Sequence, residues 1–170
     1  MTMIGSDRPG LVELMSKTVT SNAGNWEASR MARLANRFAG ILLIKVEAAR
    51  ADALGHALRT LEQHGLKIIL EHGGDTAAPG GRAMHLELVG GDRPGITRAV
   101  TQALAARGVN VEELATSVVS APDSGEPLFH LDAELRVPAD VNAGELRRDL
   151  EGIAGDLMVD LDLEDSDTVR

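Results

Sequence analysis

The chain has 170 residues, of which 44% are apolar and 25% are charged, a composition typical of a folded globular protein. Its formal charge of -9 repels the phosphate backbone and argues against direct nucleic-acid binding, and the absence of Cys excludes disulfides and thiol chemistry. No stretch approaches the ~18 uninterrupted apolar residues of a membrane span, and the first residues lack the pattern of a leader. We therefore expect a cytoplasmic protein with no membrane partner.

The first half of the chain predicts six elements in the order β-α-β-β-α-β. A very short strand ends at Ile4, and apolar residues recur at helical spacing after the loop SDRPG at 6–10. NWEASRMAR at 25–33 and FAGILLIKVE at 38–47 predict two strands, apolar residues from Leu54 to Leu61 predict a second helix, and LKIILEH at 66–72 predicts the last strand. The Gly, Pro and small residues at 73–82 are typical of a linker.

The second half predicts the same order with clearer signals. AMHLELVG at 83–90 alternates like a half-buried strand, and the loop GDRPG at 91–95 leads into a helix that ends at Gly108. The segments at 109–121 and 127–137 form a predicted hairpin, and Asn142 with Glu145 is a candidate capping box for the second helix. DLMVDLDL at 156–163 predicts the final strand, and an acidic tail follows at 164–170.

A repeat with an offset of 85 residues relates the two halves. It superimposes Asp7–Gly10 on Asp92–Gly95 and pairs Asn25 with Asn110. Each copy predicts one ferredoxin-like module of the α+β class, which is a four-stranded antiparallel sheet with both helices on one face. The predicted domains are 1–72 and 83–163.

The repeated Asp-Arg-Pro-Gly loop favours a particular kind of ligand. Pro fixes the first turn, Gly lets another group approach the backbone, and the exposed amides of a helix N-terminus attract a carboxylate or a phosphate. The glycine patterns of dinucleotide and nucleoside triphosphate sites are absent. Asn25 and Asn110 open the second strand of each copy, and we expect them at the same end of the sheet as the loop, where an amide can donate and accept. The alternative interpretation is a turn whose polar side chains satisfy the local backbone.

Longer stretches resemble a known family. GSDRPGLVELMSKTVTSNAGNWEASRMARLANRFAGILLI at 5–44 and VGGDRPGITRAVTQALAARGVNVEELAT at 89–116 resemble two ACT domains, and their tandem arrangement resembles the glycine cleavage system transcriptional repressor family. The resemblance implies a non-enzymatic regulator that binds an amino acid or another small ligand and acts on gene control through a partner protein. The ligand-binding residues that it implies are Asp7, Arg8, Pro9, Gly10, Leu11 and Asn25 in the first copy and Asp92, Arg93, Pro94, Gly95, Ile96 and Asn110 in the second.

Two features set the copies apart. MTMI, the first strand of copy one, is shorter than RAMHLELV in copy two, although this strand should be central in its sheet. Copy two has a longer hairpin in place of RMARLANRFAGILL. We therefore expect an imperfect first site, two sites that need not bind the same ligand, and ligand at the second loop before the first.

Other functions have less support from the residues. No H-E-x-x-H, His-x-His or G-x-S-x-G pattern is present, so we expect no metal, cofactor or catalytic residue. His85 and Glu87 should share a sheet face with His130 and Asp132, which leaves a metal-dependent enzyme as one alternative. A ligand-free adaptor that only contacts another protein is the other alternative. Exposed sheet edges are compatible with a homodimer, whichever of these functions the chain has, the ligand-binding regulator included.

Overall fold

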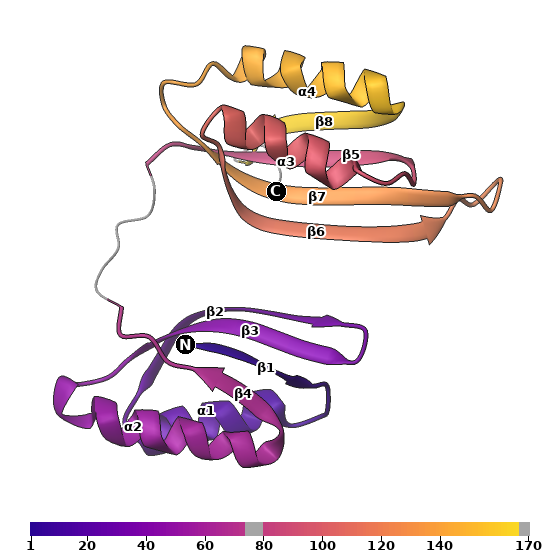
Figure 1. Ribbon diagram of the computed structural model, residues 1–170. Coiled ribbons are helices and arrows are strands. Elements are labelled where there is room, and N and C mark those ends of the chain that lie inside the picture. Colours follow the sequence, from indigo (N-terminus) through magenta and orange to yellow (C-terminus); the bar gives the residue numbers. More distant parts are fainter. Residues whose placement is uncertain (74–79, 167–170) are drawn as a thin grey trace. The chain divides into compact units, whose positions relative to one another are not determined.

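The chain folds into two compact units with the same order of elements (Figure 1). The computed structural model describes residues 1–73 and 80–166, and the units are Met1–Thr76 and Ala77–Arg170. The first unit contains β1 (Thr2–Ser6), α1 (Leu11–Ser21), β2 (Asn25–Leu34), β3 (Arg37–Lys45), α2 (Ala48–Thr60), the 3-10 helix η1 (Leu61–His64) and β4 (Leu66–Ile69). The second contains β5 (Arg82–Gly91), α3 (Ile96–Ala106), β6 (Asn110–Ser120), β7 (Pro127–Val137), α4 (Ala143–Leu157) and β8 (Val159–Asp165).

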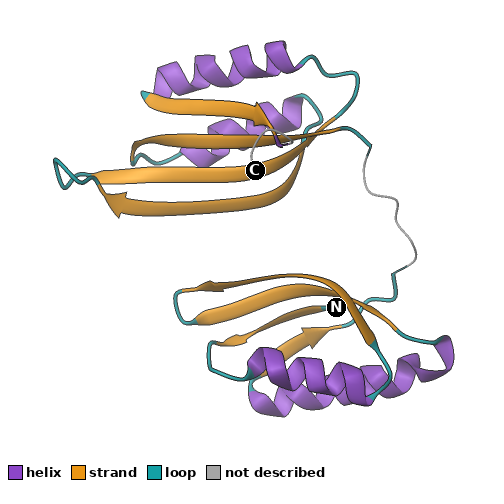
Figure 2. Ribbon diagram, turned by 180° about the vertical axis from the view of Figure 1, so that it is seen from behind, coloured by secondary structure: helices purple, strands orange, loops and turns teal. Residues whose placement is uncertain are grey.

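Each unit consists of one sheet and two helices. The strand orders are β2-β3-β1-β4 and β6-β7-β5-β8, and all neighbouring strands are antiparallel. Both helices of a unit cover the same face of its sheet and leave the other face open (Figure 2). This arrangement confirms the two predicted ferredoxin-like modules. None of the described helices is long and apolar enough to cross a membrane.

The first strand is longer than the sequence predicts. β1 continues past Ile4 to Ser6, lies in the middle of its sheet and pairs with both β3 and β4. Gly5 and Ser6 have a low preference for strands, so the sequence pattern does not indicate that the strand continues through them. A Cβ atom at Gly5 would lie 2.8 Å from the carbonyl oxygen of Gly65, so this position needs glycine. The first unit therefore has a complete central strand, which removes the reason for expecting a weaker first site.

Other boundaries also differ from the predicted ones: β3 ends at Lys45 and not at Glu47, and β8 begins at Val159 and not at Asp156, because α4 continues to Leu157. β4 ends at Ile69 and not at His72. β5 begins at Arg82, the last residue of the predicted linker, whose residues 74–79 lie outside the described residues. β8 continues two residues into the predicted tail, where Asp165 pairs with Arg82 at 3.1 Å. Residues 167–170 of that tail also lie outside the described residues.

A separate aliphatic core lies between the sheet and the helices of each unit. On α1, Leu11, Met15 and Val19 recur at helical spacing and are each at most 3% exposed. The residues 85 positions later on α3 are buried in the same way. Among the described residues no polar or charged side chain is buried, so apolar burial is the main force that packs both cores.

A β-bulge with an ion pair marks the start of the second strand in both units. The register shifts at Glu27 in β2 and at Glu112 in β6. Glu27 lies 3.9 Å from the ammonium of Lys45, and Glu112 lies 3.1 Å from the guanidinium of Arg136. The hydrogen bonds that Arg136 donates to the carboxylate of Glu112 raise the pKa of Arg136 above its ordinary value. The repeated Glu that follows each repeated Asn therefore has a structural role.

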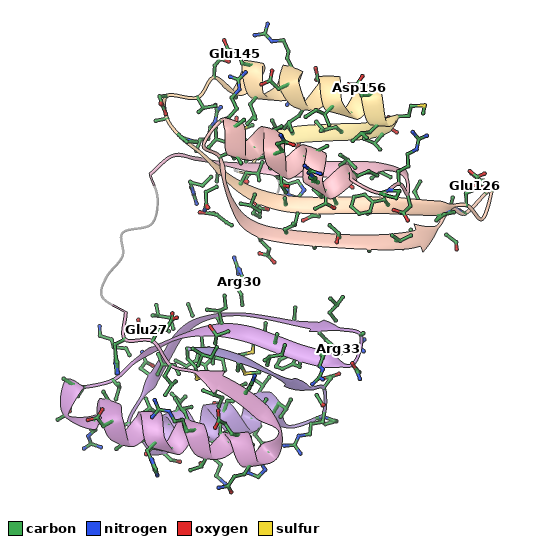
Figure 3. The ribbon with its side chains drawn as sticks, viewed as in Figure 1. Glu27, Arg30, Arg33, Glu126, Glu145 and Asp156 are labelled. Carbon is green, nitrogen blue, oxygen red and sulfur yellow. The ribbon has the colours of Figure 1, made fainter. Side chains whose placement is uncertain are left out.

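Helix α4 begins with a side-chain cap and is tied to α3. The Oδ1 atom of Asn142 accepts hydrogen bonds from the amides of Gly144 at 2.8 Å and Glu145 at 3.3 Å, as the predicted capping residue should. The carboxylate of Glu145, at the start of α4 (Figure 3), accepts a bond from Arg107 at 2.9 Å. Hydrogen bonds to Glu145 and Asp149 raise the pKa of Arg107, which links the end of α3 to α4.

Candidate functional site

Both Asp-Arg-Pro-Gly loops connect a central strand to the helix that follows. Gly10 at the N-cap of α1 has a φ of 88°, and Gly95 at the N-cap of α3 has a φ of 99°. These left-handed values suit glycine, because an L side chain would be strained there. Among the described residues no side chain caps either helix, and apart from the neighbouring residues of the chain no atom lies within 4 Å of where a Cβ would stand at either glycine. Each loop therefore presents the amides of a first helical turn to its surroundings.

The side chains of the first loop are held by the rest of the unit. The amide of Asp7 donates to the carbonyl of Asn36 at 2.9 Å, and its carboxylate lies 3.7 Å from Nε of Arg33, at the β2–β3 hairpin (Figure 3). The guanidinium of Arg8 donates to the carbonyl of His64 at 2.7 Å. Asp7 and Arg8 therefore order the loop and leave its backbone near Gly10 to face outward.

The second loop has the same backbone shape but a weaker anchor. The amide of Asp92 donates to the carbonyl of Pro127 at 3.0 Å. The guanidinium of Arg93 lies 4.0 Å from the sulfur of Met158, whereas the equivalent Arg8 donates to the carbonyl of His64. A thioether is a weaker acceptor than a carbonyl, so Arg93 is held less firmly than Arg8.

A shallow cavity of about 300 Å³ opens beside the first loop. The loop residues Arg8–Leu11 line it together with Glu13, Leu14 and Lys17 of α1. These three residues follow Gly10 at the spacing of one helix face, so their sequence positions already indicate that they lie beside the loop. The repeat does not reveal them, because they are not repeated in the second copy. The helix N-terminus and Lys17 supply positive charge and Glu13 supplies negative charge, so the cavity suits a small zwitterion.

Asn25 and Asn110 lie at the opposite end of their sheets from the loops. Asn25 pairs with Lys45 on β3, whereas Ser6, just before the loop, pairs with Arg37. Eight residues of β3 separate these two places, about 27 Å at the usual rise of a strand. The expectation that the Asn and the loop share one end is therefore wrong, because α1 carries the chain back along the sheet before β2 begins. The second unit has the same arrangement.

Comparisons with known proteins agree with this fold. Residues 1–71 match the model of the ACT domain family. The chain therefore contains an ACT domain in its first unit. It is 24% identical over 160 residues to the glycine cleavage system transcriptional repressor of Escherichia coli (strain K12), a match that covers 92% of this chain and 84% of that protein.

Two solved structures resemble the whole chain. An unknown protein from Galdieria sulphuraria is 33% identical with a TM-score of 0.81, and the match covers 96% of this chain and 95% of that chain. A candidate glycine cleavage system transcriptional repressor is 23% identical with a TM-score of 0.65, and the match covers 96% and 93%. The second likeness shows the fold alone.

In the predicted cluster on the sheet of the second unit, the imidazole of His85 lies beside two carboxylates. His85 and Glu87 lie opposite Glu134 and Asp132 and share the open face with His130 two residues along β7. The imidazole of His85 lies 3.1 Å from Glu134 and 3.4 Å from Asp132. Within residues 1–73 and 80–166, no group of three or more His, Asp or Glu side chains is arranged to hold a metal ion.

Proposed function

We propose that this ACT-domain protein is a cytoplasmic, non-enzymatic regulator that binds a small amino acid and controls a partner protein. The observation that carries the proposal is the cavity at the start of α1, where uncapped amides, Lys17 and Glu13 meet. The similarity to the glycine cleavage system transcriptional repressor supports a role in regulation. The formal charge of -9 favours action through a protein partner over direct contact with DNA.

The first loop offers a partner for each charged group of an amino acid. The ligand carboxylate accepts hydrogen bonds from the amides that follow Gly10 and lies near the ammonium of Lys17. The ligand ammonium donates to the carboxylate of Glu13. Leu11, which is 3% exposed, contributes an apolar part of the cavity lining.

The second loop favours a different ligand. Arg98 and Gln102 stand 85 residues after Glu13 and Lys17, so α3 lacks the carboxylate that would accept a ligand ammonium. An anion without an ammonium group fits this loop better. We therefore place the amino acid at the first loop, whereas the sequence had directed attention to the second.

The two Asn residues of the implied site need a second ACT domain. Asn25 lies about 27 Å along the sheet from the loop of its own unit, by the rise of a strand. A ligand at the loop would contact such an Asn only when another ACT domain supplies it. Asn25→Ala therefore tests whether the site is complete within one unit.

A thermal-shift screen of the full chain with the twenty amino acids tests the proposal. We expect at least one small amino acid to raise the melting temperature, and Lys17→Ala to weaken its affinity about tenfold or more, as the loss of a charge-assisted hydrogen bond should. Arg50→Ala is the matched control, because Arg50 lies near the start of α2 and does not line the cavity. An affinity that survives both Lys17→Ala and Glu13→Gln would contradict the proposed site. A screen without any shift would favour the ligand-free adaptor.

A further inference from the structure

The open sheet faces of the two units differ in chemistry at equivalent positions. In the first unit, Ile69, Thr2 and Ile41 lie side by side across β4, β1 and β3. The equivalent row across β8, β5 and β7 of the second unit is Asp162, Glu87 and Asp132. A sheet face in contact with water is normally polar, as it is in the second unit, so the first face is the exception.

The exception extends over a patch, which we call the apolar face. Its members are exposed aliphatic side chains on three adjacent strands: Ile4 (46% exposed), Ile41 (64%), Leu43 (59%) and Ile69 (58%). Single exposed apolar residues are common on protein surfaces, whereas a contiguous group usually marks an interaction surface.

Cations surround the apolar face. Lys67 pairs in register with Ile4, and Arg30 pairs with Ile41 and projects away from the helices (Figure 3). Arg37 and Lys45 lie on the same face at the two ends of β3. Residues 1–73 contain nine Lys and Arg against seven Asp and Glu, a formal charge of +2. The positive charge around the apolar face therefore favours a negatively charged partner surface.

The chain itself contains a surface of that chemistry, which we call the acidic face. Its carboxylates lie on the open side of β5, β7 and β8: Glu87, Asp132, Glu134, Asp160, Asp162 and Glu164. Val89 and Leu128 lie on the same side and are half-buried, and Val119 beside them is 47% exposed. Residues 80–166 contain seven Lys and Arg against seventeen Asp and Glu, a formal charge of -10.

We propose that the apolar face of one copy of the chain docks on the acidic face of a second copy. Apolar side chains on both faces lose contact with water, while Lys67 and Arg30 meet carboxylates at the rim. Docking either face on its own kind would bring like charges together, so each contact joins two different faces. Each copy carries both faces, and a reciprocal pair of contacts makes a dimer.

Sedimentation of the full chain with mixed variants tests this contact. We expect self-association in the wild type and monomers for two variants, Ile41→Asp with Leu43→Asp, and Glu87→Lys with Asp160→Lys. A mixture of the two variants should form a heterodimer, because each retains the face that the other lacks. Val12→Asp is the matched control, since Val12 is 47% exposed on α1, away from the sheet, and should associate like the wild type. Circular dichroism checks that each variant is folded.

Three results would overturn the proposal. A wild type that stays monomeric at all concentrations excludes the contact. A Glu87→Lys, Asp160→Lys variant that still associates shows that the acidic face is not used. Because the chain contains no Cys, Ile41→Cys gives a single labelling site, and a monomer in which this thiol resists labelling would show that the face is covered without a second copy. The contact does not depend on amino acid binding, so either proposal can fail alone.

Discussion

At the scale of single residues, the copies differ where the backbone is left-handed. Before α1 and α3 the two copies agree, because the left-handed N-cap residue is a glycine in both, Gly10 and Gly95. Before the last strand of each unit, Gly65 has a φ of 77°, but its equivalent Met158 has a φ of 54°. A residue with a Cβ is strained in this region by roughly 1–2 kcal/mol. At this position, therefore, the second unit carries strain that the first avoids, whereas Ala23 in the first unit has a φ of 56° where its equivalent Gly108 has a φ of 66°.

Met158→Gly should stabilise the second unit. Relief of the strain is partly offset by the greater freedom of glycine in the unfolded chain, so we expect the free energy of unfolding to rise by about 0.5 kcal/mol. Met158 is 67% exposed, and little packing is lost. Gly65→Ala is the reciprocal change and should lower the free energy of unfolding by about 1 kcal/mol. Urea unfolding followed by circular dichroism measures both, and a less stable Met158→Gly protein would contradict the assignment of strain.

At the scale of elements, the helices begin in different ways. α4 has a side chain that satisfies its first amides, whereas α1, α2 and α3 have no capping side chain. On α1 and α3 the N-cap is a left-handed glycine, which leaves the amides open to a ligand. The cap on α4 therefore stabilises the fold, while the uncapped loops are available for binding.

Asn142→Ala should lower the free energy of unfolding by about 1 kcal/mol, the usual effect of removing an N-cap side chain. Glu47→Ala is the matched control, because Glu47 is the N-cap of α2 and makes no capping bond. We expect the control to change the free energy by less than about 0.5 kcal/mol. An equal decrease in the free energy of unfolding of the two variants, measured by urea unfolding, would show that the two hydrogen bonds accepted by Asn142 contribute nothing to stability.

The sequence predicts the elements better than it predicts the site. Helical spacing at Leu11, Met15 and Val19 and the offset of 85 residues were enough to establish the order of elements in both units. The predicted position of Asn25 was wrong, because the distance between the loop and this Asn depends on the direction in which α1 returns along the sheet. Glu13 and Lys17 were missed because they are not repeated in the second copy, although their spacing from Gly10 places them on one helix face.

At the scale of the whole molecule, charge is distributed unevenly along the chain. Residues 1–73 have a formal charge of +2 and residues 80–166 have a formal charge of -10, although both segments form the same fold. The net charge of -9 hides this asymmetry. Complementary charges on separate surfaces bring partners together faster and fix their orientation.

Salt should weaken the self-association of the chain. Raising the salt concentration from about 0.05 M to about 0.5 M shortens the screening length from about 14 Å to about 4 Å, which screens the attraction between the apolar face, with its rim of cations, and the acidic face. We expect the dissociation constant measured by sedimentation to rise about tenfold or more. Association that strengthens with salt would show that apolar contact alone drives it.

The location of the bound amino acid is the most direct test of the proposed regulator. The measurement is a two-dimensional ¹H–¹⁵N NMR titration of the full chain with the amino acid that most raises its melting temperature. The proposal predicts that the largest amide shifts occur from Gly10 to Leu14, with smaller shifts around Asn25. Largest shifts at Asn25 and Lys45, at the other end of the sheet, or no shifts with any amino acid, would contradict it.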